Sequence, residues 1–278
     1  MQEILFANFL ILKYTPSIVV VSICSPPNGS QWHRKSFFGA FLLFVTQKLV
    51  PGGIKGVPLT LAIAIISMAI GSIFGLFIAL CRIYNIPLLK QMAVVYVSFM
   101  RGTPLLVQLY VFFYGIPIFL EFLNETQGWD LDGNTISPLV YALIAYTLNT
   151  SAYQSEVFRS SIQTIDPGQI EAAYSVGMTT FQAVKRIIFP QSLGAAIHNL
   201  GNIFISLIKA TSLAFAVKVV EIMAISKVIA NDGYKYLEMY LVASLIYWIL
   251  CFFFERLFVV IEKKLSPYEL REEVRSVS

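Results

Sequence analysis

Residues 56–81 read GVPLTLAIAIISMAIGSIFGLFIALC, and no charged residue interrupts them. Lys55 and Arg82 stand at the two ends of this stretch. A helix needs about 20 mostly apolar residues to cross the hydrocarbon core of a bilayer. The stretch exceeds that length, so it predicts a membrane-spanning helix.

Four further apolar runs follow along the chain. Lipid tolerates only helices or closed barrels, and these runs lack the alternation of barrel strands. We therefore predict an all-α integral membrane protein, with a transmembrane domain over residues 46–268 that holds five core helices. The four further runs lie at 91–120, 134–155, 187–208 and 239–254.

The composition of the whole chain supports a membrane protein. Of its 278 residues, 57% are hydrophobic and 13% are charged, whereas soluble domains carry about 25% charged residues. The net charge of +4 is small, which argues against nucleic-acid binding. Three scattered cysteines show no metal-ligand or redox spacing. We expect no catalytic residues, no metal and no cofactor.

The two ends of the chain differ from this core. Residues 1–45 contain an apolar run around Lys13 and the turn Ser25-Pro26-Pro27. They predict an atypical N-terminal extension, which is either one extra span or the product of a mis-assigned start. Residues 269–278 are expected to form a cytoplasmic tail.

Basic residues in short loops indicate the orientation of a membrane protein, because they favour the cytoplasmic side. The loop 121–133 holds four acidic residues and no Lys or Arg, so it should face outward. The segment 159–186 and the C-terminal residues are basic and should lie in the cytoplasm. The basic residues in 34–55 do not fit this scheme, because they would face outward.

The segment 157–190 is too long for a turn and too polar for lipid. Asp166-Pro167-Gly168 is a turn signal with a proline suited to a first helical turn. A short helix is predicted over Gln169–Ser175, and Gly177 can end it in a left-handed conformation.

A second short helix is predicted over 181–189. Thr179 or Thr180 can cap its start, and Pro190 should end it. The two helices together offer an apolar docking surface for another protein. Its predicted members are Ile170, Ala173, Val176, Met178, Phe181 and Val184.

This segment resembles the EAA loop of permeases from ATP-binding-cassette importers. The resemblance rests on Glu171-Ala172-Ala173, Gly177 and Ile187-Ile188-Phe189-Pro190, although Phe189 replaces the more usual leucine. In that family the loop forms a coupling helix that sits in a groove of a separate ATPase subunit. The residues implied to couple to the ATPase are Glu171, Ala172, Ala173, Gly177 and Pro190.

Three more stretches are similar to the polar amino-acid branch of this family, which includes histidine, glutamine, arginine and cystine permeases. They are 101–104 with Gln108, 152–159 and 209–213, and the resemblance covers roughly residues 50–268. The residues 212–215 and 220–223 are closest to the cystine type. The resemblance implies import of a polar amino acid, two ATPase copies, a second permease subunit in a homodimer or heterodimer, and an external binding protein.

Polar stripes on two predicted spans suggest a substrate path. Asn149, Tyr153 and Glu156 recur on one helix face, and Asn202, Ser206 and Lys209 do so on another. Such stripes either line a path or bind helices together. Arg101 is either functional or simply near a helix end, and Gly102 and Pro104 favour a helix break there. The candidate path residues are Arg101, Gln108, Asn149, Tyr153, Asn202, Ser206 and Lys209.

The sequence also limits the mechanism. It holds no Gly-x4-Gly-Lys-Ser/Thr phosphate loop, so a separate polypeptide must supply ATP hydrolysis. Five spans are too few to enclose a path, which requires a second permease copy or a close relative. An ion-coupled secondary transporter is the alternative, but it would require inverted repeats and intramembrane acids. A membrane-embedded enzyme is a third possibility, with no cluster of catalytic residues to support it.

Overall fold

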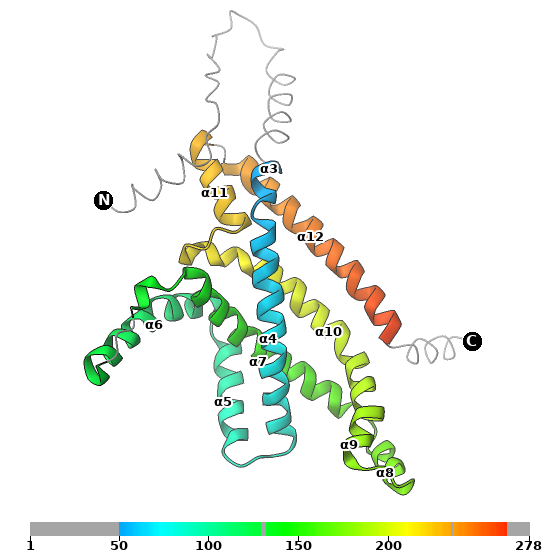
Figure 1. Cartoon of the computed structure of the whole chain (residues 1–278). Coiled ribbons are helices and arrows are strands. Elements are labelled where there is room, and N and C mark those ends of the chain that lie inside the picture. Colours follow the sequence, from blue (N-terminus) through cyan, green and yellow to red (C-terminus); the bar gives the residue numbers. More distant parts are fainter. Residues whose placement is uncertain (1–49, 129–131, 235, 266–278) are drawn as a thin grey trace, which may run out of the picture. The chain divides into compact units, whose positions relative to one another are not determined.

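The computed structural model describes residues 50–128, 132–234 and 236–265. These residues form helices joined by short connections, with no strand among them (Figure 1). The predicted extension, 1–45, and the predicted tail, 269–278, lie outside the described residues. The elements are α3 (Val50–Ile54), α4 (Val57–Ile83), α5 (Leu89–Gly102), α6 (Leu105–Gln127), η2 (Gly133–Thr135), α7 (Pro138–Gln163), α8 (Pro167–Ser175), α9 (Thr180–Ala183), η3 (Val184–Ile188), α10 (Phe189–Ala210), η4 (Thr211–Val217), α11 (Ile222–Gly233) and α12 (Tyr236–Leu265).

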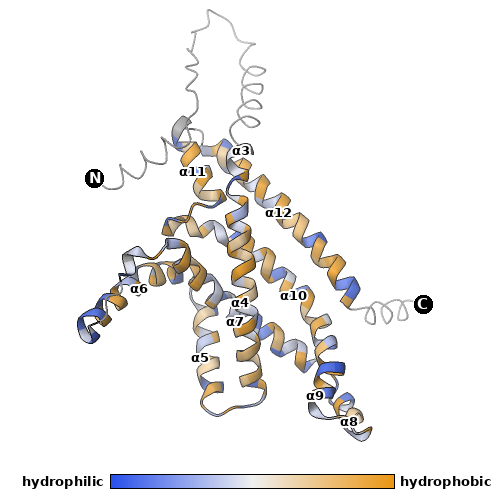
Figure 2. Ribbon diagram, viewed as in Figure 1, coloured by the Kyte–Doolittle hydropathy of each residue, from blue (hydrophilic) through white to orange (hydrophobic). Residues whose placement is uncertain are grey.

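Four helical segments of the described residues are long and apolar enough to cross a membrane. They are Gly52–Ile83, Leu105–Gln127, Thr180–Val217 and Tyr236–Leu265. Figure 2 shows hydrophobic residues along most of α4, and hydrophilic ones at the tip of α6, around α9 and at the end of α12. The predicted all-helical membrane class is confirmed. The count of five spanning helices stays a prediction.

The helix predicted over 134–155 is α7, which is long enough to span but more polar than the other four. It has 26 residues and packs against α4, α5, α6 and α10. The polar residues of α7 are buried between these neighbouring helices and so do not contact lipid, which is why a helix at this position can be more polar than the others. These buried polar residues include Thr147, Thr150, Ser151, Gln154 and Ser155.

Two glycines allow α4 to approach α7 closely. A Cβ atom on Gly75 would lie 2.9 Å from the Ser151 carbonyl oxygen, and one on Gly71 would lie 3.0 Å from the Gln154 side chain. Small residues four apart on one face permit such close packing of membrane helices. Gln154 uses the proximity, because its Nε2 donates to the Ser72 hydroxyl at 3.1 Å.

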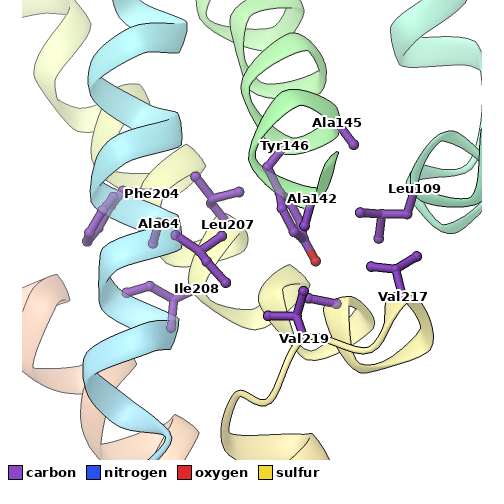
Figure 3. Close-up of a cluster of buried hydrophobic side chains, with 12 residues drawn as sticks. Ala64, Leu109, Ala142, Ala145, Tyr146, Phe204, Leu207, Ile208, Val217 and Val219 are labelled. Carbon is purple, nitrogen blue, oxygen red and sulfur yellow. The ribbon is translucent and has the colours of Figure 1, made fainter. Parts of the chain in front are cut away.

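The main apolar core joins α4, α6, α7, α10 and the segment that follows α10. Figure 3 shows the α7 side chains Ala142 and Tyr146 beside residues of these neighbours. The Tyr146 hydroxyl donates to the Ala210 carbonyl at 2.9 Å, so α7 is joined to the end of α10. This core fixes the helices that carry the regions described next.

Candidate coupling loop and polar networks

We use the name candidate coupling loop for residues 166–190, which contain α8, α9 and η3. The Asp166 carboxylate accepts a hydrogen bond from the Gly168 N–H at 2.8 Å and caps α8. Gly177 has a φ of +79°, a left-handed conformation that glycine adopts without steric cost. Thr179 and Gln182 form a reciprocal capping box at α9. The predicted helix starts and the predicted turn are thus all present.

The second short helix does not end where the sequence predicted. Pro190 lies in the first turn of α10, and the chain stays helical to Ala210. Pro190 stands where the π pattern of η3 gives way to the α pattern of α10, so its missing N–H falls at the joint and does not end the helix. The residues of η3 form a wide π turn that joins α9 to α10. The prediction that Pro190 ends the helix is wrong for this reason.

The candidate coupling loop exposes large apolar side chains. Val176 is 76% exposed and Phe181 is 72% exposed, and Tyr174 is also exposed. Ala173 is only 3% exposed, because α8 packs against α9. The prediction that Ala173 contributes to a docking surface is therefore wrong. Its role is to let the two helices approach.

Four of the five residues expected to couple lie on the outside of this loop. Glu171, Ala172, Gly177 and Pro190 are all exposed. The loop is also connected to the start of α10, since the Gln191 side chain donates to the Gln169 side chain at 2.7 Å. A partner bound to the candidate coupling loop would thus contact a segment that is bonded directly to α10.

A second region surrounds the break between α5 and α6, which the sequence favoured at Gly102 and Pro104. The break divides the run 91–120, so the prediction of one spanning helix there is wrong: α5 ends at Gly102, and α6 continues to Gln127.

We use the name helix-break network for Met100, Thr103, Gln108 and Asn149. Gln108 is 4% exposed, and its Nε2 donates to the Met100 carbonyl at 2.9 Å and to the Thr103 hydroxyl at 2.7 Å. The end of a helix leaves carbonyl groups without partners, and Gln108 satisfies one of them.

Asn149 of α7 completes this network. Its Nδ2 donates to the Gln108 Oε1 at 3.0 Å and to the Met100 carbonyl at 3.3 Å. Two candidate path residues, Gln108 and Asn149, are therefore bonded to each other. Their observed contacts stabilise the broken helix.

A cluster of charged residues lies where α4, α5 and α7 meet. The Glu156 carboxylate pairs with Arg82 at 2.7 Å, Arg159 at 2.8 Å and Arg101 at 3.6 Å. The pairing of Glu156 with Arg159 was predicted from their spacing. The contact with Arg82 was not, because the two residues are 74 positions apart.

Arg101 is the most exposed member of this cluster. Its side chain is 46% exposed, and its guanidinium lies 5.5 Å from the centre of the Tyr153 ring. Three guanidinium groups around one carboxylate leave an excess of positive charge. Such a site attracts an anionic group more readily than a paired cluster does.

The second polar stripe lies apart from these networks. Asn202, Ser206 and Lys209 are all exposed on α10, on the side opposite to the buried residues Phe204, Leu207 and Ile208. Asn149 instead contacts α5 and α6. No hydrogen bond joins the two stripes within the described residues of one chain.

The sequence prediction missed several residues that shape these regions. Tyr96 donates from its hydroxyl to the Leu148 carbonyl at 2.7 Å, which joins α5 to α7. Glu221 is fully buried, caps α11 and accepts the Tyr247 hydroxyl at 2.6 Å. The available signal was an acid just before an apolar stretch, a common helix start.

The chain matches a known family over most of its length. Residues 71–267 match the family described as "Binding-protein-dependent transport system inner membrane component". The chain is 38% identical to the L-cystine transport system permease protein TcyL of Bacillus subtilis (strain 168), over 84% of this chain and 95% of the relative. It is 38% identical to the nopaline transport system permease protein NocM of Agrobacterium fabrum (strain C58 / ATCC 33970), over 78% of this chain and 89% of the relative.

Solved structures agree with this match. One chain from the "Crystal structure of an amino acid ABC transporter with histidines" is 32% identical, with a TM-score of 0.68 over 81% of this chain and 98% of that chain. A chain of the MetNI methionine ABC transporter in an inward-facing conformation shares the fold, with a TM-score of 0.56 at 19% identity, over 78% of this chain and 95% of that chain. This chain therefore belongs to the family of binding-protein-dependent transport system inner membrane components.

Proposed function

We propose that this chain is the membrane-spanning subunit of an ATP-binding-cassette importer for polar amino acids. The observation that carries this proposal is the candidate coupling loop, with Val176 and Phe181 exposed on two short capped helices. Burying one such side chain in a partner contributes about 1.5–3 kcal/mol. A groove on an ATPase subunit would supply that burial.

The same reasoning extends to the assembly. A polar helix face is costly in contact with lipid, and Asn202, Ser206 and Lys209 form such a face on α10. A second permease subunit would cover this face or enclose water beside it. We infer a complex of two permease subunits, two ATPase subunits and an external binding protein.

ATP hydrolysis is assigned to the separate subunit, so the chain itself is not an enzyme in this proposal. ATP-driven closure of two ATPase subunits would draw the candidate coupling loops together. The covalent chain from η3 into α10 would carry that movement to the helices along the path. The helices would then alternate between inward-open and outward-open arrangements.

The proposed orientation places the candidate coupling loop and the C-terminus in the cytoplasm of a multi-pass protein of the cell membrane. The acidic end of α6 would then face outward. Single cysteines at Glu125 and Ser175, both exposed, test this in a variant without the three native cysteines. An impermeant thiol reagent added to intact cells should label the first and not the second. The reverse pattern would contradict the orientation and the coupling role together.

The substrate class follows from the relatives, among which are permeases for cystine and nopaline. We propose a polar amino acid, with cystine as the first candidate. The test is uptake of radiolabelled L-cystine, L-histidine, L-arginine and L-glutamine by proteoliposomes that hold the full complex. Saturable, ATP-dependent uptake of at least one is expected. ATP hydrolysis without uptake of any of them would contradict the proposed substrate class.

A further inference from the structure

An open pocket of about 660 Å³ lies at the end of the molecule where α6 ends and α7 begins. Its walls come from α6, from η2 with the start of α7, and from the residue after η4. This volume lies within the range of small-molecule sites. The residues that matter here are Phe113, Tyr114, Glu121, Tyr141 and Lys218.

The apolar part of the pocket is aromatic and fixed in place. The Phe113 ring lies edge-on to Tyr114 at 4.9 Å and to Tyr141 at 6.0 Å, centre to centre. The Tyr141 hydroxyl donates to the Gly133 carbonyl, which connects the start of α7 to η2. The pocket wall is thus preorganised by contacts within the chain.

Lys218 is the cationic residue of the pocket, and its backbone is unusual. It has a φ of +64°, a conformation that is costly for residues other than glycine. A glycine would serve the backbone better at this position. The side chain is therefore the feature that lysine provides, and it lines the pocket.

Side chains of opposite charge line this pocket, with Asp132 as an acid beside Glu121 and with Lys218 as the cation. Glu121 and Lys218 both line it, and neither forms an ion pair with another described residue. Both side chains are exposed and remain open to a ligand. An α-amino acid carries one carboxylate and one ammonium group, and each forms charge-assisted hydrogen bonds with a side chain of opposite charge. A lysine and a glutamate beside aromatic walls provide both partners and an apolar surface for the side chain.

We propose that this pocket is a receiving site for a zwitterionic amino acid, with Lys218 binding the carboxylate and Glu121 the ammonium. The proposal rests on the proposed function. α7 begins at this pocket and leads to the candidate coupling loop, and its 26 residues extend about 39 Å at 1.5 Å per residue. The pocket thus lies at the opposite end of α7 from the coupling loop, where an amino acid would enter from outside.

Equilibrium binding of radiolabelled L-histidine tests this site. The permease–ATPase complex is placed in lipid nanodiscs without the binding protein. Lys218→Met should weaken binding about tenfold or more, because a hydrogen bond to a charged group is lost. Lys218→Arg should retain most of the affinity, and Glu121→Gln should reduce it. Lys227→Met is the matched control, since Lys227 contacts the Phe215 ring and does not line the pocket.

Competition with L-histidine methyl ester separates carboxylate binding from a general loss of structure. The ester lacks the charged carboxylate, so it should displace the label poorly from the wild-type complex. Lys218→Met should abolish this preference for the free acid. Equal affinity and equal preference in the wild type and in Lys218→Met would overturn the receiving site alone. A wild-type complex that hydrolyses ATP but neither binds nor transports any amino acid would overturn the proposed function as well.

Discussion

The candidate coupling loop and the helix-break network differ in whether their main side chains are exposed or find partners within the chain. The loop leaves Val176 and Phe181 largely exposed, although the backbone at the start of α9 is capped by hydrogen bonds. In the network, Gln108 is buried, and its side-chain amide forms hydrogen bonds with Met100, Thr103 and Asn149 of the same chain. The network is complete in one chain, whereas the surface of the loop stays unburied, as the proposed binding of an ATPase subunit requires.

This difference separates two kinds of functional residue. Changes in the loop should affect assembly with a partner and leave the isolated chain stable. Changes in the network should affect the stability of the chain itself, with loss of transport as a consequence. The predictions below test this contrast, in order of decreasing expected effect.

Gly177→Trp should abolish transport while the chain stays inserted. A φ of +79° disfavours any other residue at this turn, and the new ring would project into the open space beside it. The measurements are co-purification with the ATPase subunit and ATP-dependent amino-acid uptake.

Gly128→Trp is the matched control for this change. Gly128 is also left-handed and open, but it lies at the end of α6, away from the candidate coupling loop. It should leave ATPase binding intact. Normal uptake in Gly177→Trp, or equal loss in both variants, would refute a specific coupling role for the loop.

Phe181→Asp should weaken binding of the ATPase roughly ten- to a hundredfold, which corresponds to about 1.5–3 kcal/mol for an aromatic side chain that loses its burial. Titration of the ATPase subunit against the permease in nanodiscs measures the affinity. Tyr84→Asp, at another exposed aromatic residue outside the loop, should have no such effect. Unchanged affinity in Phe181→Asp would remove this side chain from the interface.

Gln108→Leu should destabilise the chain by about 1–3 kcal/mol, because buried carbonyl and amide groups lose their partner. Thermal unfolding in nanodiscs measures the change. Gln191→Leu provides the comparison, since its hydrogen bond to Gln169 is exposed and should contribute less than about 0.5 kcal/mol. Equal unfolding temperatures for the two variants would show that the helix-break network does not stabilise the fold.

Asn202→Leu tests the exposed stripe on α10 and has the smallest expected effect. If the stripe lines the path, losing one neutral hydrogen bond should cost about 0.5–1.5 kcal/mol, or up to roughly tenfold in apparent affinity for substrate. Uptake against substrate concentration at matched protein levels measures it. A less thermostable complex with unchanged concentration dependence would instead assign Asn202 to helix packing.

The sequence was sufficient to predict the class of fold and most of the local structure. Uninterrupted apolar runs located α4, α10 and α12 to within a few residues at their starts, because lipid demands such runs. Asp166, Gly177 and Thr179 each define a local backbone geometry, so the turns of the candidate coupling loop were also predictable. Pro190 is the exception, because the chain stays helical through it.

Contacts between distant residues were not predictable in the same way. The polar stripe of α7 contained Asn149, and nothing in one helix indicates that its partner is Gln108 of α6. Arg82 binds Glu156 for a similar reason: two helices far apart in sequence cross at that point. Ala173 was misassigned because an apolar residue on a short helix can face either a partner or its neighbouring helix.

The π turn of η3 has a consequence for the angular phase of the helices beside it. A π turn accommodates one residue more than an α-helical turn, and each residue of an α-helix advances by about 100°. Removing one residue from Val184–Ile188 would leave a regular α turn, which completes nearly the same rotation with one residue fewer, so α9 would keep its direction relative to α10. The same number of residues wound as a regular α-helix would instead turn α9 by about a further 100°. The π turn therefore preserves the direction in which the loop presents Phe181 while it holds one residue more.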